Sequence, residues 1–227
     1  MNIRSLALLV LSLGTGCVSG SWSHPTMWFD DPKTAYEKQL ETQTTREQIK
    51  LIHASIRGIS RKGADEQARI SEQLASRIQS EEDPFIRREI IRALAKLETP
   101  QALAVLQAAM SDSDTDVRIA ACKAWGNIGG AQATTLLGTA LGSDSNIDVR
   151  IAAAKELGNV EDPRTAKVLA TGLEDSDPAL QLTALESLEL VSGANFDKDV
   201  NLALRFAKGE VKDVPQTSLA QRVRNLF

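Results

Sequence analysis

One stretch of about ten residues returns four times along this chain, at an interval of 31 or 32 residues. The copies are Pro84–Leu94, Asp116–Trp125, Asp148–Leu157 and Leu180–Leu188, with Arg87, Arg118, Arg150 and Gln181 at equivalent positions. Self-similarity at a fixed period of this length indicates a repeat protein. Each unit of such a protein buries its apolar face only by stacking on its neighbours. The repeat therefore constrains the fold more than any other feature of the sequence.

Each copy follows another apolar pattern with helical spacing, so every unit is predicted to hold two helices. The apolar residues of the preceding helices are Leu74 and Ile78, Val105, Leu106 and Ala109, Leu136, Leu137 and Ala140, and Val168 and Leu169. Short turns rich in Ser, Asp and Asn separate the two helices. These side chains can accept hydrogen bonds from the free N–H groups at the start of the second helix. No stretch alternates as a strand does, so the chain is predicted to be all-α.

Helix ends are marked by particular residue pairs. An N-cap residue followed by proline predicts that a helix begins, and this occurs at Thr99-Pro100 and Asp162-Pro163. Glycine followed by asparagine lies where the second helices are expected to end, at Gly126-Asn127 and Gly158-Asn159.

The second and third copies resemble the HEAT family in its short bacterial form, the HEAT-like or PBS-lyase-type repeat. The pattern D-x-x-V-R-x-x-A-x-x-A-L-G is carried, read loosely, by Asp116-Val117-Arg118, Ala121 and Ala124, and by Asp148-Val149-Arg150, Ala153 and Leu157-Gly158. The first and fourth copies depart from it. The resemblance implies a right-handed α-solenoid of about four helix pairs, at residues 64–98, 99–129, 130–161 and 162–193. It implies a fold and no reaction.

The segments beside the array, residues 32–63 and 194–227, are predicted to form capping helices that cover the open ends of the stacked core. Asp31-Pro32 opens one helix, and Thr44 with Glu47 forms a capping-box signature for the next. A last helix is predicted to begin at Ser218. It is interpreted as a cap, with a docking peptide as the alternative.

Residues 1–16 have the composition of a secretory signal peptide, with Arg4 before a short apolar run. Gly14-Thr15-Gly16-Cys17 resembles a bacterial lipobox, which implies cleavage before Cys17 and lipidation of that residue. A plain secretory signal with an incidental cysteine is the alternative. A multiply acylated Cys17 would anchor the chain stably, because burial of each CH₂ contributes about 0.8 kcal/mol.

Residues 17–31 would then form a tether. The aromatic side chains of Trp22, Trp28 and Phe29 would either seat at the membrane interface or dock on the solenoid. Val18 stands where the lipoprotein family has aspartate for inner-membrane retention. The expected location is therefore the cell envelope, facing the periplasm, on the cell membrane or, preferably, the outer membrane. The lipid at Cys17 is the only membrane anchor expected.

Composition and motifs exclude several classes. Twenty-six Lys and Arg against 30 Asp and Glu give a net charge of −4, which does not indicate nucleic-acid binding. The two histidines, His24 and His53, have no cysteine or second histidine at ligand spacing, so no metal site is expected. No nucleophile–base arrangement or phosphate-binding loop appears. Cys122 and Trp125 align with apolar residues of the other copies and are interpreted as core. We expect no cofactor, no catalytic residue and no enzyme.

Two charged columns remain. The first consists of Arg87, Arg118 and Arg150, with Asp116 and Asp148 before the last two. It would be either an anion-binding ladder or a set of structural bonds to turn carbonyls and carboxylates of neighbouring units. The structural interpretation is preferred, because Asp and Arg at fixed positions near a helix start complement turn and helix-end dipoles.

The second column consists of Arg92, Lys123, Lys155 and Glu186 on the second helices, which line the concave surface in the HEAT family. Its basic members would form either a positive stripe for a partner, with Arg88 and Lys96 nearby, or an ordinary solvated face.

These observations predict a non-catalytic scaffold or adaptor that binds a protein partner along its concave face. Two alternatives remain. One is a bilin-attaching lyase, because related repeats occur in phycobilisome lyases, although a signal peptide and few aromatic residues argue against it. The other is a structural component of an envelope assembly.

Overall fold

The structure is a computed structural model that describes residues 44–97 and 99–215. Several predictions concern residues outside these ranges: the signal peptide, Cys17 and the aromatic residues of the tether, the helix from Asp31-Pro32, and the last helix from Ser218.

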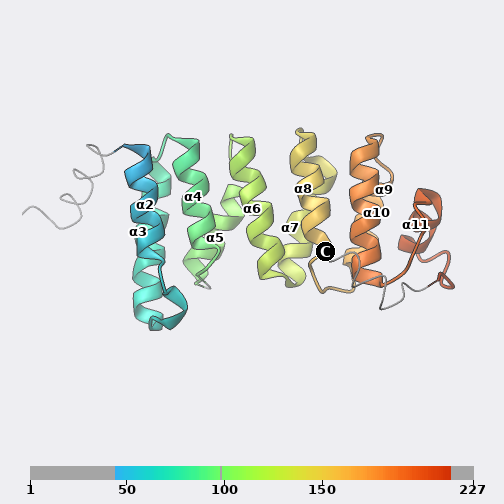
Figure 1. Ribbon diagram of the computed structural model, residues 1–227, viewed down its shortest axis with the longest axis horizontal. Helices are drawn as coiled ribbons and strands as arrows, with labels where there is room; N and C mark the ends of the chain where they lie inside the picture. Colours follow the sequence, from blue (N-terminus) through green and yellow to red (C-terminus); the bar gives the residue numbers. More distant parts are fainter. Residues whose placement is uncertain (1–43, 98, 216–227) are drawn as a thin grey trace, which may run out of the picture. The chain divides into compact units, whose positions relative to one another are not determined.

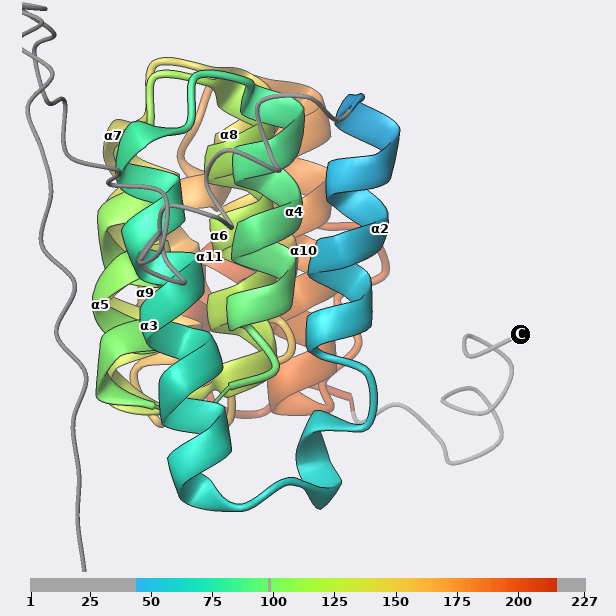
Figure 2. The ribbon, with the colours of Figure 1, turned by 90° about the vertical axis from the view of Figure 1, so that its left-hand side faces the viewer.

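Within the described residues the chain forms two layers of helices (Figures 1 and 2). The second helices of the repeats lie side by side in one layer, and the helix that precedes the array joins them. These are α2 (Thr45–Ser55), α4 (Pro84–Leu94), α6 (Thr115–Ile128), α8 (Ile147–Leu157) and α10 (Pro178–Ser192). The other layer holds α3 (Ala64–Ser80), α5 (Pro100–Ala109), α7 (Gly130–Ser143), α9 (Thr165–Leu173) and α11 (Val200–Ala207). A 3₁₀ turn, η2 (Ile59–Arg61), joins α2 to α3. The prediction of an all-α solenoid of helix pairs is confirmed.

The turn residues start the second helices as predicted. Asp83, Asp114, Asn146 and Asp177 are the N-caps, and each side chain accepts a hydrogen bond from a backbone N–H two or three residues later. Two residues before each N-cap, a carboxylate accepts the N-cap's own N–H: Glu81, Asp112, Asp144 and Asp175. These hydrogen bonds join residues only two or three places apart, so they act within each turn and helix start.

Other helix starts follow their local signals to different degrees. The capping box of Thr44 and Glu47 opens α2, and Thr99 caps α5 with Pro100 behind it, as predicted. The start expected at Asp162-Pro163 is wrong, because α9 begins at Thr165. Asp162 instead closes a turn, accepting hydrogen bonds from the backbone N–H and the guanidinium of Arg164.

The helix end expected at Gly126-Asn127 is also wrong, because α6 continues to Ile128. Gly129 ends it with φ of 72°, a left-handed backbone that glycine adopts without strain. Gly126 serves packing instead. A Cβ at this position would lie 2.5 Å from a carboxylate oxygen of Glu156 on α8.

The core is built from equivalent positions of successive repeats. The residue eleven places after each N-cap is fully buried: Leu94, Trp125, Leu157 and Leu188. Cys122 is also fully buried, at a position where the neighbouring repeats have Ile91, Ala154 and Leu185. Both Cys122 and Trp125 are therefore core residues, as predicted.

The C-terminal end of the array is closed by α11, which contacts α9 and α10. The Phe196 ring is fully buried and packs on Phe206 of α11, with 5.3 Å between the ring centroids. The backbone N–H of Asn195 donates to the carbonyl of Pro215, which brings the following segment back to the array. None of the helices in residues 44–97 and 99–215 has the length and apolar character needed to cross a membrane.

Candidate functional site

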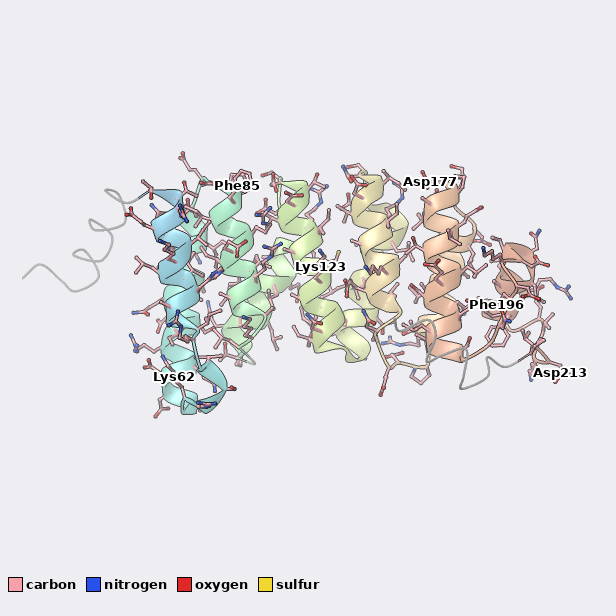
Figure 3. All side chains as sticks on the ribbon, viewed as in Figure 1. Lys62, Phe85, Lys123, Asp177, Phe196 and Asp213 are labelled. Atoms are coloured by element: carbon pink, nitrogen blue, oxygen red, sulfur yellow. The ribbon has the colours of Figure 1, made fainter. Side chains whose placement is uncertain are left out.

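The second helices lie side by side in one layer, and the outer side of this layer is here called the second-helix face (Figure 1). Counting from each N-cap places equivalent residues at one level on neighbouring helices. Four residues at the fifth position form the aliphatic row, Ile49, Ile119, Ile151 and Leu182, whereas α4 has Arg88 at this position. The residues at the ninth position form the basic row: His53, Arg92, Lys123, Lys155 and Glu186. Figure 3 shows Lys123 on α6, in this layer.

The five members of the basic row are all exposed. The side chains of Lys123 and Lys155 make no hydrogen bond or ion pair with any other residue of the described ranges. Arg92 donates to Glu89 at 2.6 Å, yet its side chain remains 51% exposed. The row changes sign at Glu186 on α10.

The two other residues predicted to bind a partner differ from each other. Lys96 is exposed and lies just beyond the end of α4. Arg88 is engaged within the fold. Its Nη1 lies 3.1 Å from the carboxylate of Asp116 on α6, and its guanidinium lies 5.1 Å from the centre of the Phe85 ring. Arg88 therefore links α4 to α6 and is less available to a partner than Lys96.

Two buried carboxylates lie between members of the basic row. Glu89 contacts His53 of α2 at 3.0 Å and Arg92 of its own helix. Burial would raise the pKa of Glu89, but the hydrogen bond with His53 and the charge of Arg92 outweigh it, and the pKa lies below its usual value.

Glu156 is the second of these buried carboxylates. It lies between Lys123 of α6 and Lys155 of α8 but forms no ion pair with either lysine. Burial raises its pKa, and the hydrogen bond from Asn159 and the two lysine charges offset this only in part. Sequence reasoning missed Glu156. The available signal was a carboxylate at a position that holds Ala93 and Ala124 in the preceding repeats.

The arginine column of Arg87, Arg118 and Arg150 joins each repeat to the next. Arg87 donates from Nε and Nη2 to the carboxylate of Asp112 at 3.0 and 2.7 Å, and Arg118 donates to Asp144 at 2.8 and 3.1 Å. Both also donate to turn carbonyls of their own repeat. The contact of the third arginine is longer. The Nε atom of Arg150 lies 3.4 Å from the carboxylate of Asp175, and this atom makes no hydrogen bond within the described residues.

The carboxylates that meet these arginines are those of the following turn. Asp116 and Asp148 lie in the first turns of α6 and α8, where their charge favours the positive helix end. Asp116 pairs with Arg88 instead of Arg118. The partners Asp112, Asp144 and Asp175 recur at steps of 32 and 31 residues, a signal that sequence reasoning used for the helix starts and did not match to individual arginines.

Glutamine replaces arginine at both ends of this column. Gln48 of α2 accepts a hydrogen bond from Arg77, and Gln181 of α10 donates to the carbonyl of Asp175 at 2.7 Å. In the described residues α11 is the one helix after α10, and no further second helix follows it. Gln181 keeps a bond to the turn carbonyl of its own repeat without carrying a charge.

The helices α5 and α7 make few contacts with each other, and an open cleft of about 500 Å³ lies between them. It is lined by Gln107, Met110, Leu136, Thr139, Asp144 and Arg118, among others. Arg118 and Asp144 are already bound to one another. The cleft therefore offers little for recognition of a charged ligand.

Neither a reactive thiol nor a cluster of metal ligands is present in the described residues. The thiol of Cys122 is fully buried, and burial raises its pKa to about 12, with smaller effects from the charges of Asp144 and Glu156. A thiol in this state is not a nucleophile at neutral pH. No group of three or more His, Cys, Asp or Glu side chains in these ranges is placed to hold a metal ion.

A match to a known family agrees with the repeat geometry. A family model described as HEAT repeats matches residues 71–146 and 134–220. Among solved structures, the crystal structure of an engineered protein from the Northeast Structural Genomics Consortium is 20% identical. Its TM-score is 0.43, and the match covers 79% of this chain and 86% of that one. A search of curated proteins found no match.

Proposed function

Since the chain belongs to the HEAT-repeat family, whose fold is a scaffold for protein interaction, we propose that it is a non-catalytic adaptor that binds its partner on the second-helix face. This goes one step beyond the family, because it assigns the binding surface and the residues on it. The proposed contact residues are Arg92, Lys96, Lys123 and Lys155.

The observation that carries the proposal is the alignment of exposed charge on adjacent helices. Lys123 and Lys155 hold equivalent positions on α6 and α8, and their side chains form no ion pair within the described residues. Exposed charges of one sign on neighbouring elements create a local potential that attracts and orients a partner of opposite charge. The arginine column is already bound inside the array, so it supports the scaffold and does not compete for the partner.

The location of the adaptor is part of the proposal. Lipidation at Cys17 would place the solenoid at the surface of a membrane of the cell envelope, outer membrane preferred. Labelling with a radioactive fatty acid tests this, because Cys17 and the buried Cys122 are the only cysteines of the chain. Label that is lost in Cys17→Ser but kept in Cys122→Ala supports the anchor. Label that persists in Cys17→Ser, or none in the wild type, contradicts it.

The binding proposal is tested in cells with a photo-crosslinking amino acid at Ile151 on the second-helix face. The same amino acid at Lys167, exposed on α9 of the other layer, is the matched control. We expect a specific adduct from position 151 that disappears in Lys123→Glu/Lys155→Glu. The same adducts from both positions, or adducts that survive charge reversal, would exclude this surface.

A further inference from the structure

The aliphatic and basic rows run side by side along the second-helix face. Their residues are four positions apart on α2, α6, α8 and α10, which puts their Cβ atoms about 5–6 Å from each other, and Arg88 interrupts the aliphatic row on α4. Ile119 and Ile151 are partly exposed in the first row, and Leu182 is 45% exposed. An apolar strip beside a charged strip is complementary to a partner that also has apolar residues on one side and charged residues on the other. An amphipathic helix has such a surface.

The spacing along each row favours a helix over an extended peptide. Packed helices lie about 8–10 Å apart, which sets the distance between successive members of a row. One heptad of an α-helix rises about 10.5 Å, so residues seven apart return to one face at nearly this distance. Side chains on one face of a β-strand recur at about 6.6 Å or multiples of it, which does not match.

The charge on α4, α6 and α8 selects acidic residues. Arg92, Lys123 and Lys155 stand on these three helices, with Lys96 close to the first. Glu89 offsets Arg92 in part, whereas neither lysine is paired within the described residues. Carboxylates of a partner would meet these side chains at the surface, where little desolvation opposes binding.

The last helix of the row has a different character. Glu186 takes the place of the basic residue on α10, and an acidic partner residue would be repelled there. Leu182 and Leu190 lie four residues to either side of Glu186, and Leu190, at 66%, is the most exposed large apolar side chain of the described residues. Apolar side chains of a partner fit this end of the face.

We propose that the second-helix face binds an amphipathic α-helix laid along the array, with an acidic residue in each of three successive heptads over α4, α6 and α8 and an apolar residue in the fourth heptad over α10. The inference rests on the proposed function and names the chemistry of the partner. Three intervals of about 10 Å correspond to a helix of about 20 residues.

A synthetic peptide tests the inference with the full chain. The probe is a fluorescein-labelled, side-chain-stapled helix of four heptads, with leucine at one heptad position and glutamate four residues later. Leucine replaces this glutamate in the fourth heptad. A second peptide carries lysine in place of each glutamate, and a third ends after three heptads. Fluorescence polarisation gives the affinities at low and at physiological salt.

We expect the acidic peptide to bind at least tenfold more tightly than the lysine peptide, with a difference that shrinks as salt rises. Lys123→Glu/Lys155→Glu should lose at least tenfold in affinity for the acidic peptide, while Lys167→Glu on α9 should not change it. Leu182→Ser/Leu190→Ser should weaken binding of the four-heptad peptide and leave the three-heptad peptide unaffected. Lys123→Gln/Lys155→Gln, which adds no charge beside Glu156, should show a smaller loss, and thermal melting checks that each variant folds.

Equal affinity for the acidic and lysine peptides, or binding that survives both lysine variants, would overturn the inference. The proposed function and this inference can fail separately. Suppose that a cellular partner crosslinks at position 151 and requires Lys123 and Lys155, but the acidic peptide does not displace it. The proposed adaptor function would then stand, and the proposal of an acidic helix as the partner would be overturned.

Discussion

Arg118 donates two hydrogen bonds, from Nε and Nη2, to the two carboxylate oxygens of Asp144 in the next turn of the array. The two side chains are only 12% and 9% exposed. Asp144 also accepts the backbone N–H of the N-cap Asn146. The pair thus ties the start of one second helix to the start of the following one. In a solenoid such contacts between neighbours carry much of the stability, because each repeat touches only the repeats beside it.

Arg118→Ala is predicted to destabilise the chain more than Arg150→Ala. Removing Arg118 leaves a nearly buried carboxylate without its partner, which costs about 3 kcal/mol. Arg150 reaches Asp175 only at 3.4 Å and keeps a single hydrogen bond to the Asp144 carbonyl, so its loss costs about 1 kcal/mol. Urea denaturation measures both. Equal losses of unfolding free energy would show that the Arg118–Asp144 and Arg150–Asp175 contacts are equivalent in solution.

Acid is predicted to weaken the array through Asp112 and Asp144. Burial acts to raise the pKa of each carboxyl, but hydrogen bonds from Arg87 and Arg118, with those from backbone N–H groups, hold each pKa below its usual value. A lowered folded pKa gives stability that is present above about pH 4 and is lost as the pH falls through the folded pKa.

Asp144→Asn removes one of these groups, so its stability should vary less between pH 5 and pH 2 than that of the wild type. Thermal melting across this range measures the slope. A variant as acid-sensitive as the wild type would place the sensitivity elsewhere.

Glu156→Gln is predicted to stabilise the chain at neutral pH. Burial raises the pKa of Glu156, so its contribution to stability is greatest below about pH 4, where it is protonated in both states. That contribution is lost as the pH rises through the folded pKa. The melting temperature of the variant should exceed that of the wild type at pH 8 and approach it at pH 4. A variant that is less stable at pH 8 would show that the charges of Lys123 and Lys155 dominate over burial.

Cys122 is predicted to resist thiol reagents in the folded chain. Its pKa of about 12 leaves on the order of one molecule in 10⁴ as thiolate at pH 8, and the side chain is fully buried. In Cys17→Ser, where Cys122 is the only thiol, Ellman's reagent should react in denaturant and hardly at all in buffer. Rapid reaction in buffer would indicate that the α6 region opens locally.

Gly172→Ala is predicted to destabilise the pair of α9 and α10 by about 1–3 kcal/mol through overpacking. A Cβ at position 172 would lie 2.9 Å from the Cβ of Ala184 on α10. The exchange Gly172→Ala/Ala184→Gly removes that clash and should recover most of the loss, less about 1 kcal/mol for glycine inside α10. Chemical denaturation of the single and double variants measures the recovery, and no recovery would assign the cost to Leu141, 3.3 Å away.

Local signals allowed most of the fold to be predicted. The N-caps at Asp83, Asp114, Asn146 and Asp177 bond to residues two or three places away, so their effect is visible in the sequence itself. Of the two wrong helix boundaries, the one at Asp162 reflects a local turn closed by Arg164, whereas the one at Gly126 lies where a longer contact intervenes. Gly126 is retained inside α6 because Glu156 of the next second helix occupies the space beside it.

The site could be predicted only in part. The period of the repeat aligned Arg92, Lys123 and Lys155 on successive helices, and this followed from the sequence alone. The engagement of Arg88 with Asp116 and the burial of Glu156 did not, because both depend on the side chains that a neighbouring helix brings near.

The sequence by itself determined that this chain is a stack of helix pairs and where most helices begin, because hydrophobic periodicity and capping act within one or two helical turns. Only the tertiary structure decided which carboxylate each arginine meets. Arg118 and Asp144 are 26 residues apart, and their contact requires α6 and α8 to pack side by side at one level. That level is set by the fit of buried side chains between repeats.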